Sequence, residues 1–350
     1  MHAMRVHGFS FYCLRVRSLA TRLRAFQDYV QSPAVGAAIV TADGLADLAT
    51  LGVCNIDGDD AVRDDDAWHI GSCTKSISAL AWAQLVEAGQ ASWAAPLAEI
   101  FEDVDCHVGF HNVTITDLLQ CRAGLPANPG FLDNHRSHRD TRPLVAQRTG
   151  VAEQLLTEAP QRPGIFVYSN LSYILLGAAI DRIGESSYEE TIAQTILSPL
   201  GIGDAGFGPP PRIVGHKPGV SLGRKGFSRP LWPMGTQDNA EVFNSAGRLH
   251  LPVASWAKVI GVILSGGAPL VSADSLSMLT TPPATSDFAM GWGRQATGSL
   301  VMEGSNTVNA ATVVIDTAQG RAALVVANES RDRTLEASAR FAEQLLASTR

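Results

Sequence analysis

The stretch Trp68–Ser76, WHIGSCTKS, joins a short apolar run to a longer apolar segment, SISALAWAQLVEAG. Apolar residues recur at helical spacing after Ser72, and Gly89 is a natural C-terminal stop, so a helix beginning near Ser72 is predicted. Residues three apart on a helix share a face, which makes Ser72 and Lys75 neighbours on the first turn. Ser72 is therefore either a helix cap or a nucleophile with Lys75 as its activating partner.

The second interpretation has a defined chemistry. A serine hydroxyl is a weak nucleophile at neutral pH and needs a base within hydrogen-bond reach. If the apolar segment partly desolvates Lys75, the pKa of this lysine falls and the amine can accept or relay a proton. The helix N-terminus adds a positive potential that favours an anion at Ser72. The alternative is a capping Ser72 beside a solvated Lys75.

Two further segments place polar groups at the ends of predicted elements. In GIFVYSNLSYILLG, Tyr168 and Asn170 precede a predicted helix and offer a proton-transfer group and a hydrogen-bond donor. Alternatively, Asn170 is the helix cap and Tyr168 only packs. In SLVMEGSNT, Gly304 and Ser305 end a predicted strand, where a ligand could lie against backbone N–H groups. The alternative there is an ordinary strand end.

Strand-like runs occupy both ends of the chain and helical patterns occupy the middle. A hairpin with its turn at Asp43-Gly44 follows the first helix, and β-rich runs return after Gly291. We expect an α/β (α+β) fold with one antiparallel sheet flanked by helices, built from both chain ends, plus an all-α region from the middle. The expected parts are an N-terminal extension at 1–17, a sheet region at 18–75 and 240–350, and a helical region at 76–239.

Composition narrows the class of ligand. The net charge is −7, and no basic stripe interleaved with aromatic residues is present, which argues against nucleic acid. No apolar run reaches the roughly 18 residues that span a bilayer. The expected partner is therefore a small molecule, and the oligomeric state stays open.

The cysteines and the N-terminus bear on the compartment. Five cysteines, an odd number without a metal-binding spacing, favour reduced thiols, and we expect neither a metal nor an organic cofactor. The apolar part of the N-terminus is broken by Arg15 and Arg17, and no cleavage site for a signal peptide follows. A cytoplasmic protein is the expectation, with a periplasmic or secreted location and another translation start left open.

The three motifs, in their order along the chain, are similar to those of a known family. S-x-x-K at Ser72, Y-x-N at Tyr168 and x-x-G ending at Gly304 resemble the serine β-lactamase and penicillin-binding-protein superfamily. The similarity is to its branch of class C β-lactamases, carboxylesterases and D-aminopeptidases, and it covers about Ala34 to Asn328. VTITDLLQCRAGLPAN, PGIFVYSNLSYILLGAAIDRIG and FNSAGRLHLPVASWAK support it. It implies the β-lactamase/transpeptidase-like fold and a serine hydrolase.

The resemblance also implies roles for single residues. Ser72 would be the acylated nucleophile, and Lys75 and Tyr168 would share its proton and pass it to the leaving group. Asn170 would orient Lys75 or the substrate.

Other positions would bind the substrate. The backbone N–H groups of Ser72 and Ser305 would form the oxyanion hole, beside Gly304. Asn128, after GLP, would meet the acyl group.

The third motif departs from the family pattern. Relatives usually carry K-T-G or H-x-G there, whereas this chain has Met302-Glu303-Gly304. A neutral thioether cannot receive a substrate carboxylate, and Glu303 would repel an anion if it faced the site. We therefore expect neutral esters or amides, or a substrate whose amine meets Glu303, rather than penicillins or cephalosporins.

The expected function is cleavage of an ester or amide through an acyl-enzyme on Ser72 that water then attacks. The activity would be carboxylesterase-like or β-lactamase-like, so a β-lactam stays among the substrates considered. Two alternatives remain open: an acyltransferase that uses the same acyl-enzyme, and a catalytically degenerate β-lactamase-like binding protein.

Overall fold

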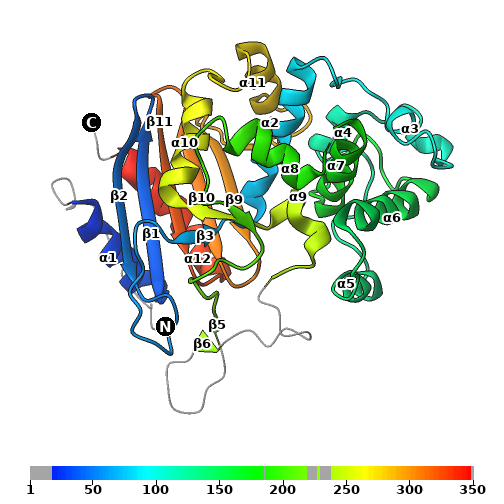
Figure 1. Cartoon of the computed structure of the whole chain (residues 1–350). Coiled ribbons are helices and arrows are strands. Elements are labelled where there is room, and N and C mark those ends of the chain that lie inside the picture. The colour runs from blue at the N-terminus through cyan, green and yellow to red at the C-terminus, as the bar shows by residue number, and fades with distance from the viewer. Residues whose placement is uncertain (1–17, 185, 219–226, 229–237, 348–350) are drawn as a thin grey trace, which may run out of the picture.

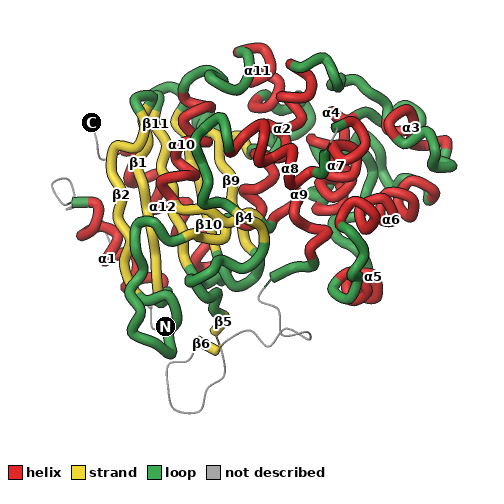
Figure 2. The backbone as a smooth tube through the Cα atoms, in the orientation of Figure 1, coloured by secondary structure: helices red, strands yellow, loops and turns green. Residues whose placement is uncertain are grey.

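The strand-forming runs from the two chain ends meet in one antiparallel sheet (Figures 1 and 2). The computed structural model describes residues 18–184, 186–218, 227–228 and 238–347. Within them the main sheet has six strands in the order β2-β1-β11-β10-β9-β8, all paired antiparallel. The strands are β1 (Ala34–Thr41), β2 (Gly44–Gly52), β8 (Gly293–Arg294), β9 (Leu300–Ser305), β10 (Ala310–Asp316) and β11 (Arg321–Ala327). The predicted fold class is confirmed, and the predicted extension 1–17 lies outside the described residues.

Strand β1 is buried on both faces, which explains its continuous apolar run AVGAAIV. Helix α10 (Val253–Leu264) packs on one face, and α1 (Leu19–Val30) with α12 (Asp332–Ala347) covers the other (Figure 1). The rings of Phe26 on α1 and Phe341 on α12 stack with centroids 4.7 Å apart. The N-terminal and C-terminal helices thus share one core layer behind the sheet.

Smaller strands connect the sheet to the rest of the chain. Strand β7 (Leu249–Pro252) pairs with β3 (Ala67–His69) and with β4 (Gly206–Phe207), and β5 (Lys217–Pro218) pairs with β6 (Phe227–Ser228). The middle of the chain therefore contributes some strand as well as helix. The predicted boundaries of the two regions stay a prediction.

Beyond α2, most of the remaining helices lie on the side away from the sheet, with α11 at one end of α2 (Figure 1); α2 and these helices have the following bounds. They are α2 (Thr74–Glu87), α3 (Leu97–Ile100), α4 (Ile115–Leu119), α5 (Phe131–Ser137), α6 (Leu144–Thr157), α7 (Asn170–Ile183), α8 (Tyr188–Ile192), α9 (Asn244–Gly247) and α11 (Ala273–Thr280).

Helix α2 lies between the sheet and this helical group (Figure 1). Its residues from Thr74 to Ala83 are all buried, because α7, α8, α9 and α11 pack against it and β9 packs on the turn that precedes it. Alanine, leucine and tryptophan satisfy such an environment without polar atoms in need of water, whereas a lysine does not. The position of Lys75 in this helix therefore needs a specific explanation.

Candidate active site

The turn that carries Ser72 is a short 3₁₀ segment between β3 and α2. Gly71–Cys73 form this turn, and Gly71 has φ +51°, a left-handed conformation that favours glycine. The Ser72 side chain makes no capping hydrogen bond to the turn or to α2. The Thr74 hydroxyl instead donates to the Gly71 carbonyl at 2.7 Å. The capping interpretation of Ser72 is therefore wrong, and its half-buried hydroxyl is left for another partner.

That partner is Lys75, whose side chain is 0% exposed. Its Nζ lies 3.1 Å from Ser72 Oγ, 2.6 Å from Asn170 Oδ1 and 2.5 Å from the Ala246 carbonyl oxygen. All three partners are uncharged. The prediction that Ser72 and Lys75 are neighbours on one face is confirmed by this contact.

Burial dominates the electrostatics of Lys75. Desolvation lowers the pKa of its amine from 10.5 to about 7, against smaller raising effects of Cys121 and Cys73. The amine also lies 5.0 Å from the ring centroid of Tyr168 and 5.4 Å from that of Tyr173. Ring faces favour the charged form of an amine, but desolvation is the largest effect and the pKa of Lys75 is lowered. A large fraction of Lys75 is therefore a neutral amine at neutral pH.

Asn170 reaches Lys75 because another residue caps its helix. The Ser169 hydroxyl accepts from the Ser172 backbone N–H at 3.0 Å, which makes Ser169 the cap of α7. The alternative in which Asn170 is the cap is therefore wrong. Asn170 Nδ2 donates to Asn128 Oδ1 at 2.7 Å, so Asn128, Asn170 and Lys75 form one hydrogen-bonded chain. This chain also fixes which end of each amide faces which neighbour.

Tyr168 stands at the open side of the site and is 36% exposed. Desolvation raises the pKa of its phenol well above the usual range, although a hydrogen bond with the Ser72 side chain acts in the opposite direction. The phenol therefore keeps its proton at neutral pH. Its ring meets that of Phe288 edge-on at 5.9 Å, and Phe288 in turn contacts Phe166 at 5.3 Å. Tyr168, which bonds the Ser72 side chain, is thus the first of three aromatic rings in contact.

The end of β9 packs directly on the Ser72 turn. A Cβ at Gly304 would collide with the Ile70 carbonyl oxygen and the Ser72 nitrogen, so only glycine permits this approach. The Ser305 hydroxyl is engaged with Ser330 Oγ at 2.6 Å and with the Thr307 N–H at 2.8 Å, so its backbone is what faces Gly71. Within the described residues no acceptor is paired with the Ser72 N–H.

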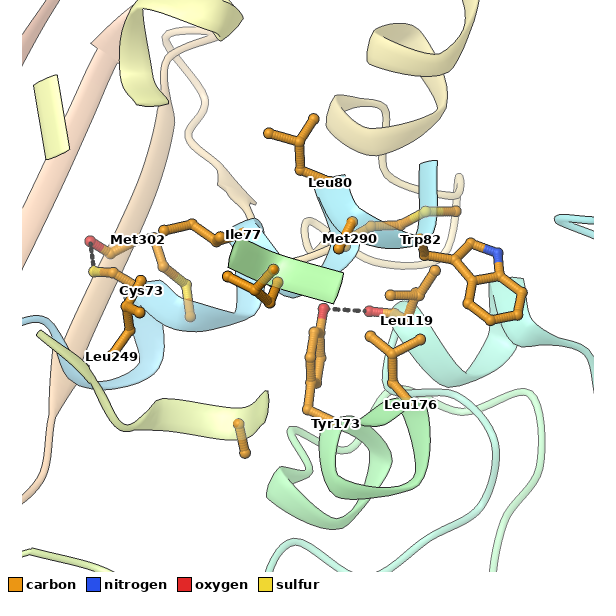
Figure 3. Packing of buried hydrophobic residues seen from close by; sticks show 14 of the residues in the cluster. Cys73, Ile77, Leu80, Trp82, Leu119, Tyr173, Leu176, Leu249, Met290 and Met302 are labelled. Carbon is orange, nitrogen blue, oxygen red and sulfur yellow. Dashed lines mark hydrogen bonds between the residues drawn. The ribbon is translucent and has the colours of Figure 1, made fainter. Parts of the chain in front are cut away.

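Met302 and Glu303 lie on opposite faces of β9. Met302 is 5% exposed and belongs to the core cluster with Ile77 and Cys73; the Cys73 thiol donates to the Met302 carbonyl at 3.6 Å (Figure 3). Glu303 shares the face of Val301, which packs toward α1 and α12. Desolvation, and then the Glu336 carboxylate of α12, raise the pKa of Glu303. The structure therefore does not bring Glu303 to the hydroxyl of Ser72.

A cavity of about 550 Å³ adjoins Asn128. Buried apolar residues such as Leu171 and Phe243 line part of it, and Arg142, paired with Asp140 at 2.7 Å, lies among its charged residues. Ligand cavities of this size typically combine an apolar lining with a few placed polar groups.

Sequence reasoning missed several groups that hold the site. The Ala246 carbonyl comes from the quoted segment FNSAG, but a backbone acceptor has no side-chain signature. His69 stands inside WHIGSCTKS, and its partner Asp238 lies in a region without any motif. Cys73 is fully buried, and desolvation raises the pKa of its thiol far above neutral, as expected for a packing residue.

Comparison with known proteins shows the family of the chain. The family model described as Beta-lactamase matches residues 21–347, and the chain belongs to this family. Among curated proteins it is 23% identical over 248 residues to a protein of Bacillus subtilis (strain 168) that is named "Putative penicillin-binding protein PbpX". The match covers 69% of this chain and 58% of that protein, so the chain spans less than two thirds of the relative's length.

Solved structures share the fold. The octameric penicillin-binding protein homologue from Pyrococcus abyssi aligns with a TM-score of 0.76 and 21% identity, over 93% of this chain and 76% of that one. The class C β-lactamase from Rhodobacter sphaeroides gives 0.74 and 15%, over 94% and 99%. A D-stereospecific amidohydrolase from Streptomyces sp. gives 0.68 and 17%, over 92% and 98%. Family membership supports a serine hydrolase-type activity in general.

Among the helices that the structure describes, none has the length and apolar character needed to cross a membrane.

Proposed function

We propose that this protein is a serine hydrolase that cleaves an ester or amide through an acyl-enzyme on Ser72. The observation that carries the proposal is the 3.1 Å contact between Ser72 Oγ and the fully buried Lys75 Nζ. A neutral amine has two N–H donors and one lone pair. The carbonyl oxygens of Asn170 and Ala246 accept both donors, which leaves the lone pair for the proton of Ser72.

Acylation of Ser72 then proceeds through a tetrahedral intermediate. Ser72 Oγ attacks the substrate carbonyl carbon while its proton moves to Lys75 Nζ. The resulting oxyanion lies against the unpaired N–H of Ser72 and the N–H of Ser305. When the carbon–leaving group bond breaks, the Tyr168 phenol donates a proton to the leaving group and regains one from Lys75. In deacylation the oxygen of water bonds to the acyl carbon while a proton of the water moves to Lys75 Nζ; the bond from that carbon to Ser72 Oγ then breaks, and Oγ takes the proton back from Lys75.

The surroundings of Ser72 favour an uncharged substrate. Met302 occupies the position where relatives usually carry a lysine or histidine, and its side chain is buried and uncharged. This position of β9 therefore offers no cation to a substrate bound at Ser72. The aromatic rings of Phe288 and Phe166 follow that of Tyr168, and the cavity beside Asn128 lies at the far end of the hydrogen-bonded chain Asn128–Asn170–Lys75. We therefore expect neutral esters and amides with apolar groups to be cleaved faster than anionic β-lactams.

A fluorophosphonate probe tests the proposal directly, because Ser72 Oγ would form a bond to phosphorus as fluoride leaves. Wild type should be labelled and Ser72→Ala should not. Ser76→Ala is a matched control, because Ser76 lies one turn further along α2 and its hydroxyl donates to the Cys73 carbonyl at 2.8 Å rather than to a group of the site. Unlabelled wild type would reject the enzyme. Labelling without release of product from p-nitrophenyl esters would favour the binding-protein alternative.

A further inference from the structure

A buried carboxylate joins the two backbone segments that border Ser72. Asp238 is 1% exposed. Its Oδ2 accepts from His69 Nε2 at 3.0 Å and from Arg248 Nε at 3.1 Å, and its Oδ1 accepts from Asn306 Nδ2 at 3.1 Å. Asn239 N–H also donates to Oδ1 at 2.8 Å. One side chain thus holds groups from the end of β3 and from the residues after β9.

The first arm runs through His69 to the Ser72 turn. The Gly71 backbone N–H donates to His69 Nδ1 at 3.1 Å, so Nδ1 carries no proton and Nε2 donates its proton to Asp238. The carboxylate therefore fixes both the tautomer and the orientation of the ring. This hydrogen bond holds the Ile70–Gly71 peptide, and the next peptide along the chain, Gly71–Ser72, carries the Ser72 N–H, so the bond restrains that N–H through Gly71.

The second arm runs through Asn306 to the end of β9. Asn306 Nδ2 donates to Asp238, while its Oδ1 accepts from the N–H groups of Val308 at 3.3 Å and Asn309 at 2.9 Å. The amide is thereby fixed on both sides. Asn306 follows Ser305, so its position sets where the Ser305 peptide lies against Gly71.

The carboxylate stays ionised in this setting. Burial acts to raise the pKa of Asp238, but His69, Arg248 and Asn306 together hold this pKa below its usual range. Arg248 is itself tied to Asn244 Oδ1 by its Nη1 at 2.7 Å. A charge with fixed donors on several sides resists movement, because any shift would leave a buried polar group unsatisfied.

We propose that Asp238 is a positioning residue that clamps the two halves of the oxyanion hole together, one through His69 and Gly71 and the other through Asn306 and Ser305. The clamp rests on the proposed function, because it acts on N–H groups that would bind the oxyanion. It spaces the two donors for the tetrahedral intermediate and leaves the ground-state substrate largely unaffected. In this chain Asp238 would act without help from a cation on β9, because the buried Met302 stands where relatives usually carry a lysine or histidine.

If Asp238 positions the oxyanion hole, replacing it should weaken stabilisation of the transition state and leave binding of the substrate nearly unchanged. In Asp238→Asn one carboxylate oxygen becomes an NH₂ group, so one of the two arms loses its acceptor. We expect kcat for a p-nitrophenyl ester to fall roughly 10- to 100-fold while KM changes less than about twofold. Affinity for an aryl boronic acid, whose adduct with Ser72 places an oxygen in the oxyanion position, should fall in parallel with kcat.

Asp66→Asn is a matched control. Asp66 is also a buried aspartate that accepts from an arginine, Arg212 at 2.6 Å, and from a backbone N–H, that of Arg63 at 2.8 Å. It should lose a similar amount of thermal stability and keep wild-type kcat and boronate affinity. If Asp238→Asn does not fold, the His69 pair carries the same test: His69→Phe removes the arm, whereas His69→Asn keeps an acceptor near Gly71 and should recover part of kcat.

Two results would overturn the clamp. One is an Asp238→Asn enzyme with wild-type kcat and boronate affinity, and the other is a loss confined to KM or matched by Asp66→Asn. Fluorophosphonate labelling of wild type separates this failure from that of the proposed function. A labelled wild type with an unaffected Asp238→Asn rejects only the clamp, whereas an unlabelled wild type rejects the hydrolase and the clamp with it.

Discussion

Replacing Lys75 by methionine should change how the stability of the protein depends on pH. Lys75→Met keeps the length of the side chain but removes its titrating amine from a fully buried position. The fixed cost of the change is the loss of hydrogen bonds to Asn170 Oδ1, the Ala246 carbonyl and Ser72 Oγ. That cost does not vary with pH, whereas the cost of burying an ammonium group does.

The size of the effect follows from the lowered pKa. The amine of Lys75 titrates at about 7 in the folded protein and at 10.5 without burial, a difference worth about 5 kcal/mol at 1.36 kcal/mol per unit. Below the folded pKa the whole penalty is present. Between the two pKa values the unfolded chain binds more protons than the folded one, so wild-type stability rises with pH. Integration gives a gain of about 2 kcal/mol between about pH 7 and about pH 9, and methionine contributes no such gain.

Denaturant unfolding of both proteins at several pH values measures this gain. The free energy of unfolding of Lys75→Met minus that of wild type should fall by about 2 kcal/mol from about pH 7 to about pH 9. Other titrating groups are common to both proteins and cancel in the difference. Lys258→Met is the control, because Lys258 is exposed and its amine donates to a backbone carbonyl, that of Gly201, at 3.0 Å. Any change with pH that Lys258→Met shows is the effect of removing a lysine charge as such and is subtracted. A difference for Lys75→Met that stays constant after this subtraction would refute a lowered pKa of Lys75, and with it the neutral amine as the base.

Three further predictions concern activity and packing. The kcat/KM of wild type for a neutral p-nitrophenyl ester should rise with pH through about 7, because only the neutral form of Lys75 accepts the serine proton; a flat profile from about pH 5 to about pH 9 would argue against Lys75. Tyr168→Phe should lower kcat by about 10²-fold or more with little change in melting temperature, since the residue is 36% exposed; wild-type kcat would remove the phenol from the mechanism. Met302→Ala should cost about 2–4 kcal/mol of stability in denaturant unfolding and leave the ratio of ester to β-lactam turnover unchanged. A changed ratio would mean that the side chain at 302 contacts substrate.

The pattern of apolar residues predicted well those elements whose position follows from burial or from local turn geometry alone. Apolar runs on both faces of β1 and turn residues at Asp43-Gly44 set the hairpin, and the amphipathic pattern of α12 set the final helix. These elements follow from burial and local turn geometry, which a sequence carries directly. Caps were less predictable, because Ser169 and Asn170 are both good capping residues and only the structure distinguishes them.

The candidate site was predicted where side chains carry the chemistry and not where the backbone does. Ser72, Lys75 and Asn170 have residue types suited to proton transfer, and the structure brings them into contact. The carbonyl of Ala246 could be any residue's carbonyl, so no sequence pattern marks it. The side of the strand on which Glu303 lies depends on how β9 packs against α2 and α12, a long-range property that spacing within the strand does not determine.

Intact mass of the protein after incubation with p-nitrophenyl esters of increasing acyl size tests the acyl-enzyme most directly. Wild type should gain the mass of one acyl group, and the adduct should disappear as ester is consumed. Ser72→Ala should gain none, and Lys75→Met should acylate far more slowly at about pH 7 because no neutral amine accepts the proton. An adduct that persists in Ser72→Ala, or ester turnover in that variant at the wild-type rate, would contradict Ser72 as the nucleophile.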